Sequence, residues 1–79
     1  MDTLERVCEI IADATQNPVE EITERSTAKN VDGWDAVAQV SIMAAIEMDF
    51  GVVFTEEEVA SLDSIRKIMH ALRLQQVAA

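Results

Sequence analysis

Residues 32–50 decide the fold of this chain, and they read DGWDAVAQVSIMAAIEMDF. The stretch opens with a glycine-containing turn. Asp35 then stands where its carboxylate can accept a hydrogen bond from a free N–H of a first helical turn, and its charge suits the positive end of the helix dipole. Gly51 follows Phe50 and can adopt the left-handed conformation common just past a helix. The pattern predicts a helix that begins after Asp35 and ends at Phe50.

Successive residues of a helix are about 100° apart around its axis, and at this spacing the apolar residues of the expected helix fall on two opposite sides. A chain this short cannot easily bury both sides. We expect the face with the larger side chains to join the core and the other face, which includes Ser41, to stay exposed for docking. The alternative is a central helix that is buried all round. The larger side chains are Ile42, Met43, Ile46 and Phe50, and the smaller apolar face holds Val37, Val40, Ala44 and Met48.

Length and composition indicate one small all-α domain. The chain has 79 residues, of which 49% are hydrophobic and 27% charged, as in a folded soluble protein. It contains two glycines, one proline and no tyrosine, and this scarcity of turn and β-type residues favours helices. We therefore predict a small four-helix bundle with three longer helices, a short third helix and a long first loop.

Apolar spacing and capping residues predict the other elements. A first helix is expected over about 3–15, followed by a helical turn around 19–22. Thr55 and Glu58 form a capping box that opens a short third helix. The last helix is expected over about 64–74 with Asp63 as its N-cap, and residues 75–79 are expected to fray.

The charge of the chain is concentrated in its middle. The net charge is −9, and the span from Asn30 to Ile65 holds eight acids and neither Lys nor Arg. Such a surface disfavours nucleic acid and anionic membranes as partners. It favours a basic patch on another protein. The alternative is a solvated acidic surface that only aids solubility.

No residue pattern indicates catalysis, a metal or a disulfide. Cys8, the only cysteine, lies in the apolar stripe of the first helix and is expected to be a small core residue. His70, the only histidine, is expected at the surface without a catalytic partner. Asp32 and Asp35 lack the ligand spacing of a calcium loop. No secretory signal or membrane-spanning run is present, so a cytoplasmic protein is expected.

These features together resemble the acyl carrier protein family. The family opens its second helix with a Gly-x-Asp-Ser-apolar turn, and the matching residues are Gly33-Trp34-Asp35-Ala36-Val37. Lesser matches are Glu21-Ile22-Thr23, Ile46-Glu47 with Phe50, and the acidic third helix. The resemblance covers about 4–72. It implies one acyl-carrier-like domain over residues 1–79. The implied function is that of a freestanding carrier, which shuttles thioester-bound acyl groups between enzymes of fatty acid or polyketide biosynthesis. Such a carrier has no catalytic activity of its own.

One departure from the family concerns the attachment site. In the family the serine of the motif carries 4′-phosphopantetheine through a phosphodiester. Ala36 occupies that position and has no oxygen, and Ser41 lies five residues further on, where it is no substitute. The resemblance therefore implies the cofactor only for a form with serine, and none is attachable to this chain. Either the serine was replaced by engineering, which the otherwise intact carrier features favour, or this is a natural non-carrying protein that docks on and regulates an enzyme.

The resemblance also implies partners and site residues. For a form with serine, one expected partner is a phosphopantetheinyl transferase. The other expected partners are acyl-loading, acyl-transfer or synthase enzymes with basic patches. The free chain is expected to be a monomer. Trp34 is expected either over the loop or half-exposed beside the docking face. The expected docking residues are Asp35, Val37, Val40, Ala44, Glu47 and Met48. The expected walls of an acyl pocket are Ile42, Met43, Ile46, Phe50, Phe54, Ile65 and Ile68.

Overall fold

The computed structural model describes residues 2–78, and it describes side chains as far as residue 75. The chain forms helices α1 (Thr3–Thr15), α2 (Ala36–Phe50), α3 (Glu56–Ser61) and α4 (Ile65–Ala78), with a 3₁₀ turn η1 (Val19–Glu21) after α1. Within residues 2–78 there is no strand, only an isolated bridge between Thr27 and Ser64. The prediction of an all-α fold with a short third helix and a long first loop is confirmed.

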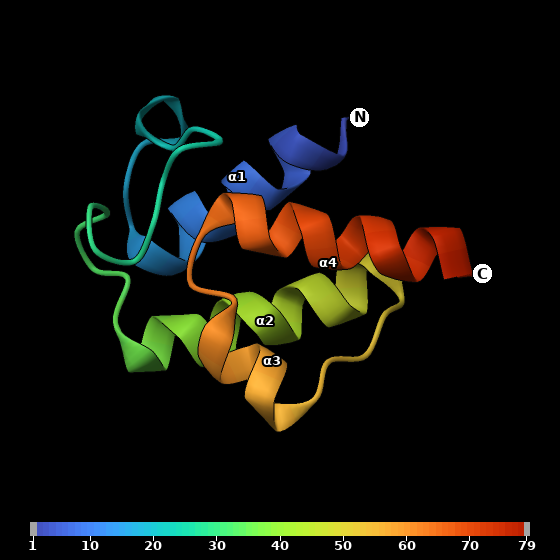
Figure 1. The fold of residues 1–79 in the computed structure, drawn as a ribbon. Helices are drawn as coiled ribbons and strands as arrows, with labels where there is room; N and C mark the ends of the chain where they lie inside the picture. Colours follow the sequence, from blue (N-terminus) through green and yellow to red (C-terminus); the bar gives the residue numbers. More distant parts are fainter. Residues whose placement is uncertain (1, 79) are drawn as a thin grey trace.

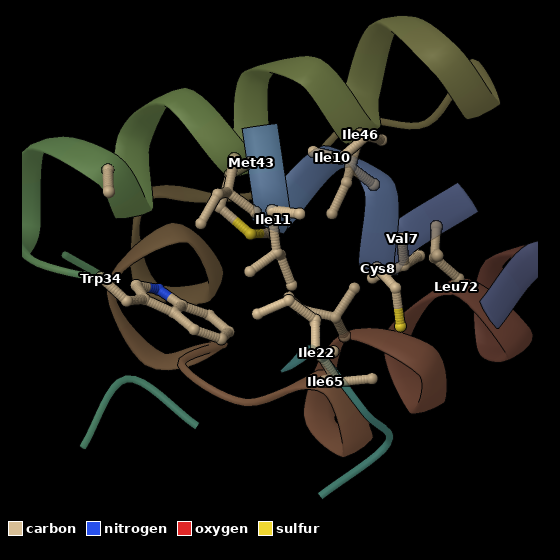
Figure 2. Close-up of a cluster of buried hydrophobic side chains, with 14 of the residues drawn as sticks. Val7, Cys8, Ile10, Ile11, Ile22, Trp34, Met43, Ile46, Ile65 and Leu72 are labelled. Carbon is tan, nitrogen blue, oxygen red and sulfur yellow. The ribbon is translucent and has the colours of Figure 1, made fainter. Parts of the chain in front are cut away.

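The three longer helices enclose one core. In Figure 1, α1 runs from the N-terminus in the direction opposite to α2 and α4, and the long loop lies at the far end of the bundle from the two termini. The most extensive contact between helices is that of α1 with α2, and α3 packs against α2. Figure 2 shows how side chains from all three longer helices and the loop converge on this core. The side chains with 0 or 1% exposure are Val7, Ile11, Ile42, Met43, Ile46, Ile65, Ile68 and Leu72.

The two faces of α2 have the predicted fates, except that Phe50 at the end of the buried face is only half-buried. Ile42 and Ile46 are fully buried and Met43 is 1% exposed, because this face packs against α1 and the rest of the core. On the opposite side Val40 is 59% exposed and Met48 is 87% exposed. The alternative of a helix buried all round is therefore wrong.

Capping residues set most of the helix boundaries. The Asp35 carboxylate accepts a 2.8 Å hydrogen bond from the Ala38 N–H and so starts α2 where predicted. Thr55 and Glu58 form the predicted capping box of α3. Gly51 ends α2 in the left-handed conformation, with φ +67°.

The predicted N-cap and the predicted end of α4 are wrong, although the helix begins at Ile65, within one residue of the predicted start. The Ser64 hydroxyl, not Asp63, accepts a hydrogen bond from the Lys67 N–H at 3.2 Å, and Asp63 instead forms an ion pair with the Lys67 ammonium at 3.0 Å. The helix continues to Ala78 instead of ending near residue 74. The Gln75 side chain donates a hydrogen bond to the Val53 carbonyl at 2.9 Å, which ties α4 at residue 75 to the α2–α3 loop. Ala79 lies outside the described residues.

The long loop is pinned at its middle and at its end. Its middle is tied to α4, because the Ala28 N–H donates to the Asp63 carbonyl at 2.8 Å and the Ile65 N–H donates to the Ser26 carbonyl at 3.1 Å. Its end approaches α1 at Gly33, where φ is +85° and a Cβ atom would lie 2.9 Å from the Thr15 carbonyl oxygen. Only glycine fits this close approach without strain, so the Gly33 turn sets where α2 begins.

Candidate functional site

The candidate attachment position is Ala36, the first residue of α2. It follows the N-cap Asp35, and its side chain is exposed at the junction of the loop and the helix. A side chain here can reach another protein, and the free N–H groups of a first helical turn favour an attached phosphate. The methyl group of Ala36 offers no oxygen for a phosphodiester, so the residue at this position does not fit the arm.

The predicted docking residues lie together along the exposed side of α2, but two of them are also structural. Val37 is 77% exposed, and Ala44 and Ser41 are exposed beside the row of larger side chains. Asp35 is exposed, yet one of its oxygens caps the helix. Glu47 is half-buried, and its Oε2 accepts a 2.8 Å hydrogen bond from the Phe54 N–H. A change at Glu47 would therefore alter the α2–α3 loop as well as the surface charge.

The acids around this face are not equivalent. Asp49 pairs with Arg6 through two hydrogen bonds of 2.8 and 2.9 Å, which hold the pKa of its carboxyl below the usual range. The hydrogen bond from Lys67 likewise lowers the pKa of Asp63. Glu56 and Glu57, in the first turn of α3, are exposed and have no hydrogen-bond or ion-pair partner among residues 2–75. These two carboxylates are therefore available to a basic partner.

The predicted acyl-pocket walls belong to one packed core. The five aliphatic members have exposures of 0 or 1%, and Phe54 is 7% exposed. Phe50 is only half-buried and packs against the edge of the cluster. Residues from α2, α4 and the segment before α3 therefore meet at one place, although they are far apart in the sequence.

A buried polar clamp is the feature that the sequence prediction missed. Trp34 is 4% exposed, and its indole Nε1–H donates to the Gln39 Oε1 at 2.6 Å. The Gln39 Nε2 in turn donates to the Val59 and Leu62 carbonyls, both at 2.8 Å. Gln39 therefore ties the loop, α2 and the end of α3 together. The available signal was its position, since Gln39 lies three and four residues before Ile42 and Met43 on the buried face of the helix.

The remaining candidate groups are not arranged for catalysis. Cys8 is a 7% exposed core residue, and burial raises the pKa of its thiol. His70 is exposed, as predicted. No group of three or more potential metal ligands occurs among the residues that the structure describes. Within the same residues, every helix is too short or too polar to cross a membrane.

Comparison with known proteins identifies the class. The family described as "Phosphopantetheine attachment site" matches residues 5–72. The chain is also 33% identical over 66 residues to a protein named "Acyl carrier protein 3" from Ralstonia nicotianae, an alignment that covers 84% of this chain and 76% of the relative. The chain therefore belongs to the phosphopantetheine-binding acyl carrier protein family. Members of this family are non-catalytic carriers that hold acyl groups through phosphopantetheine and work with a phosphopantetheinyl transferase and biosynthetic enzymes.

Proposed function

We propose that this chain is an acyl carrier scaffold, one domain over residues 1–79, that cannot take the phosphopantetheine arm as it stands. The observation that carries the proposal is the exposed methyl group of Ala36 at the first position of α2, directly after the N-cap Asp35. This is the place of the attachment serine in the family motif. The turn, the cap and the helix around it keep the geometry that an attachment site needs.

Ser41 does not replace the missing hydroxyl. It lies five residues further along α2, which places it about 7.5 Å along the axis and about 140° around it from Ala36. Its hydroxyl is exposed, but it stands among the apolar docking residues and away from the helix N-terminus. A phosphate on Ser41 would lack the free N–H groups of the first turn.

The rest of the scaffold supports delivery of an acyl group between enzymes. The exposed row of Val37, Val40 and Met48 is an apolar surface bordered by acids, which suits partners with basic patches. The core behind it supplies aliphatic side chains and the flexible Met43, which could repack around an acyl chain. Both features concern the docking and sheltering steps, and neither needs Ala36.

A second function follows if alanine is the native residue. The exposed apolar row on α2 would then serve docking alone, and the protein would bind and regulate a partner enzyme without carrying a group. A serine codon at position 36 of the native gene would favour the carrier. An alanine codon would favour the interaction protein.

The direct test is attachment of the arm. We expect no mass change when the chain is incubated with coenzyme A, Mg²⁺ and a broad-specificity phosphopantetheinyl transferase. Under the same conditions Ala36→Ser should gain the mass of one arm by intact-mass spectrometry. Its thermal stability should match that of the parent, because alanine and serine are both tolerated in an exposed first helical turn.

A matched control distinguishes the two hydroxyl positions. The double variant Ala36→Ser, Ser41→Ala should be modified as readily as Ala36→Ser alone. Modification of the unaltered chain would show that another residue takes the arm and would overturn the proposal. A folded Ala36→Ser protein that stays unmodified by several transferases would eliminate the carrier scaffold and leave the interaction protein.

A further inference from the structure

The middle of the chain and its last helix carry opposite charge. The acids of the middle span lie on α2, α3 and their flanking loops, whereas α4 contains Arg66, Lys67 and Arg73 and no acid. Lys67 is engaged with Asp63. Arg66 and Arg73 form no ion pair within the part of the chain that the structure describes. Of the four cations without an ion pair in that part of the chain, Arg25 and Lys29 lie in the long loop, and Arg66 and Arg73 share α4.

Arg66 and Arg73 border a hollow between α4 and the start of α1. The hollow has a volume of about 410 Å³. Its apolar lining comes from Leu4, Ile65 and Met69, of which Ile65 is fully buried and the other two are half-buried. Arg66, His70, Arg73 and the single acid Glu24 complete the lining. An apolar floor with a mainly basic edge is the arrangement of a docking groove for a surface that is apolar at its centre and acidic around it.

The spacing of the basic edge indicates an extended partner. Arg66, His70 and Arg73 follow one another at i, i+4 and i+7, so they share one face of α4. Seven residues of helix span about 10.5 Å, so the two guanidinium groups are spread along the groove instead of converging on one point. A row of this length matches acids at the same spacing on another helix better than it matches a single anionic headgroup.

We propose that this hollow docks an acidic amphipathic helix of a partner protein. Arg66 and Arg73 would pair with acids at matching positions of that helix, and its apolar face would cover Leu4 and Met69. The net charge of −9 opposes binding to nucleic acid or an anionic membrane, where the whole protein would meet a large negative field. A helix with a few acids and apolar anchors meets the basic edge locally and avoids that repulsion.

The groove is separate from the docking face of α2. Its lining residues come from α1, the first loop and α4, and none comes from α2 or α3. The domain therefore has one apolar surface with acidic borders and another with basic borders. It could hold two partners of opposite charge at once, with or without an arm on residue 36.

The test is titration of isotope-labelled protein with two synthetic helical peptides, followed by NMR. One peptide has leucines on one face flanked by glutamates at i, i+4 and i+7, and the other has lysines in place of the glutamates. The glutamate peptide should shift the amide signals of Leu4, Met69 and Arg73 saturably, and the lysine peptide should leave them in place. The experiment needs neither transferase nor arm, so its failure is distinct from failure of the carrier proposal.

Charge variants on the same helix provide the matched control. The double variant Arg66→Gln, Arg73→Gln should weaken binding of the glutamate peptide about tenfold. It removes two exposed ion pairs, and each contributes a few-fold in affinity. Lys67→Gln removes a charge from α4 outside the groove and should change the affinity less than about twofold.

Three results would overturn the proposal. One is the absence of saturable shifts at Leu4 and Met69 when the folded parent protein is titrated with the glutamate peptide. Another is an equal loss of affinity in Lys67→Gln and in the double arginine variant. The third is saturation of the same signals by decanoate but not by the glutamate peptide, which would make the hollow a site for a small alkyl carboxylate.

Discussion

Trp34 and Gln39 form a buried hydrogen bond of 2.6 Å that joins the end of the long loop to the first turns of α2. The same Gln39 amide holds the Val59 and Leu62 carbonyls at the end of α3. The carbonyls of the last turn of an α-helix have no donor within the helix, and Gln39 supplies one to Val59 in α3 and to its C-cap Leu62. One side chain therefore positions the acidic third helix against the docking helix, and its contacts are the place to test the fold.

Replacing Gln39 by leucine should destabilise the domain by about 2–4 kcal/mol. The change leaves the buried Trp34 N–H without its acceptor and the two α3 carbonyls without their donor, and each unsatisfied buried group is costly. Urea unfolding measures the loss, and faster amide exchange in α3 should accompany it. The exposed Ser41→Ala on the same helix is the control and should stay within about 0.5 kcal/mol of the parent. Equal stability of Gln39→Leu and the parent would show that the clamp contributes nothing.

The Arg6–Asp49 pair should make stability depend on acid pH. The pKa of Asp49 is lowered in the folded state by its hydrogen bonds to Arg6, so the pair stabilises the fold above the ordinary carboxyl pKa. This contribution should fade as the pH falls through the lowered folded value. We expect Asp49→Asn to unfold at lower urea than the parent at pH 6, and the difference should shrink as the pH is lowered toward 2.

Salt and a control variant test the same pair further. Added salt should reduce the difference between Asp49→Asn and the parent at pH 6, because the pair lies at the surface. Glu57→Gln removes a carboxylate that has no ion-pair partner within residues 2–75 and should not lower stability at that pH. A difference that persists unchanged near pH 2 would attribute the effect of Asp49→Asn to packing instead of charge.

Two glycines with positive φ should differ in their response to alanine. At Gly33 a Cβ atom would lie 2.9 Å from the Thr15 carbonyl oxygen, whereas at Gly51 nothing lies within 4 Å of it. Gly51→Ala should cost about 1 kcal/mol from the left-handed backbone alone. Gly33→Ala should cost more than about 2 kcal/mol, because the backbone strain and the close contact add. Chemical denaturation compares the two, and equal losses would show that the loop can move away from α1.

The exposed row on α2 should affect docking without affecting stability. In the Ala36→Ser background, Val40→Ser should slow attachment of the arm by about tenfold at limiting protein, since the buried area of one valine is lost from the complex. Its unfolding free energy should stay within about 0.5 kcal/mol of the parent. The measurement is the initial rate of mass gain with a phosphopantetheinyl transferase.

A second exposed valine supplies the control for this face. Val53 is 79% exposed but lies in the loop between α2 and α3, so Val53→Ser should keep the parent rate. Raising the salt concentration should slow all the variants, because the acidic borders steer the partner. Equal rates for Val40→Ser and Val53→Ser would place the docking surface elsewhere.

The local features of this protein could be predicted from the sequence because they depend on neighbours along the chain. The start of α2 at Asp35, its end at Gly51 and the capping box at Thr55 each involve residues within one helical turn. The helical period of the apolar residues likewise assigned Ile42 and Val40 to opposite faces of α2. The structure buries Ile42 and exposes Val40. The absence of an oxygen on Ala36 is a property of the residue itself.

The tertiary structure alone decided the contacts between distant segments. The sequence left Trp34 either over the loop or half-exposed beside the docking face, and the fold buries it against Gln39. The bond from Gln75 to the Val53 carbonyl likewise joins segments that are far apart along the chain. The engagement of Glu47 with the Phe54 N–H and the basic groove between α1 and α4 also require segments that come together only in the fold. Local propensity acts within a turn of helix, whereas these features depend on which surfaces the packed core leaves side by side.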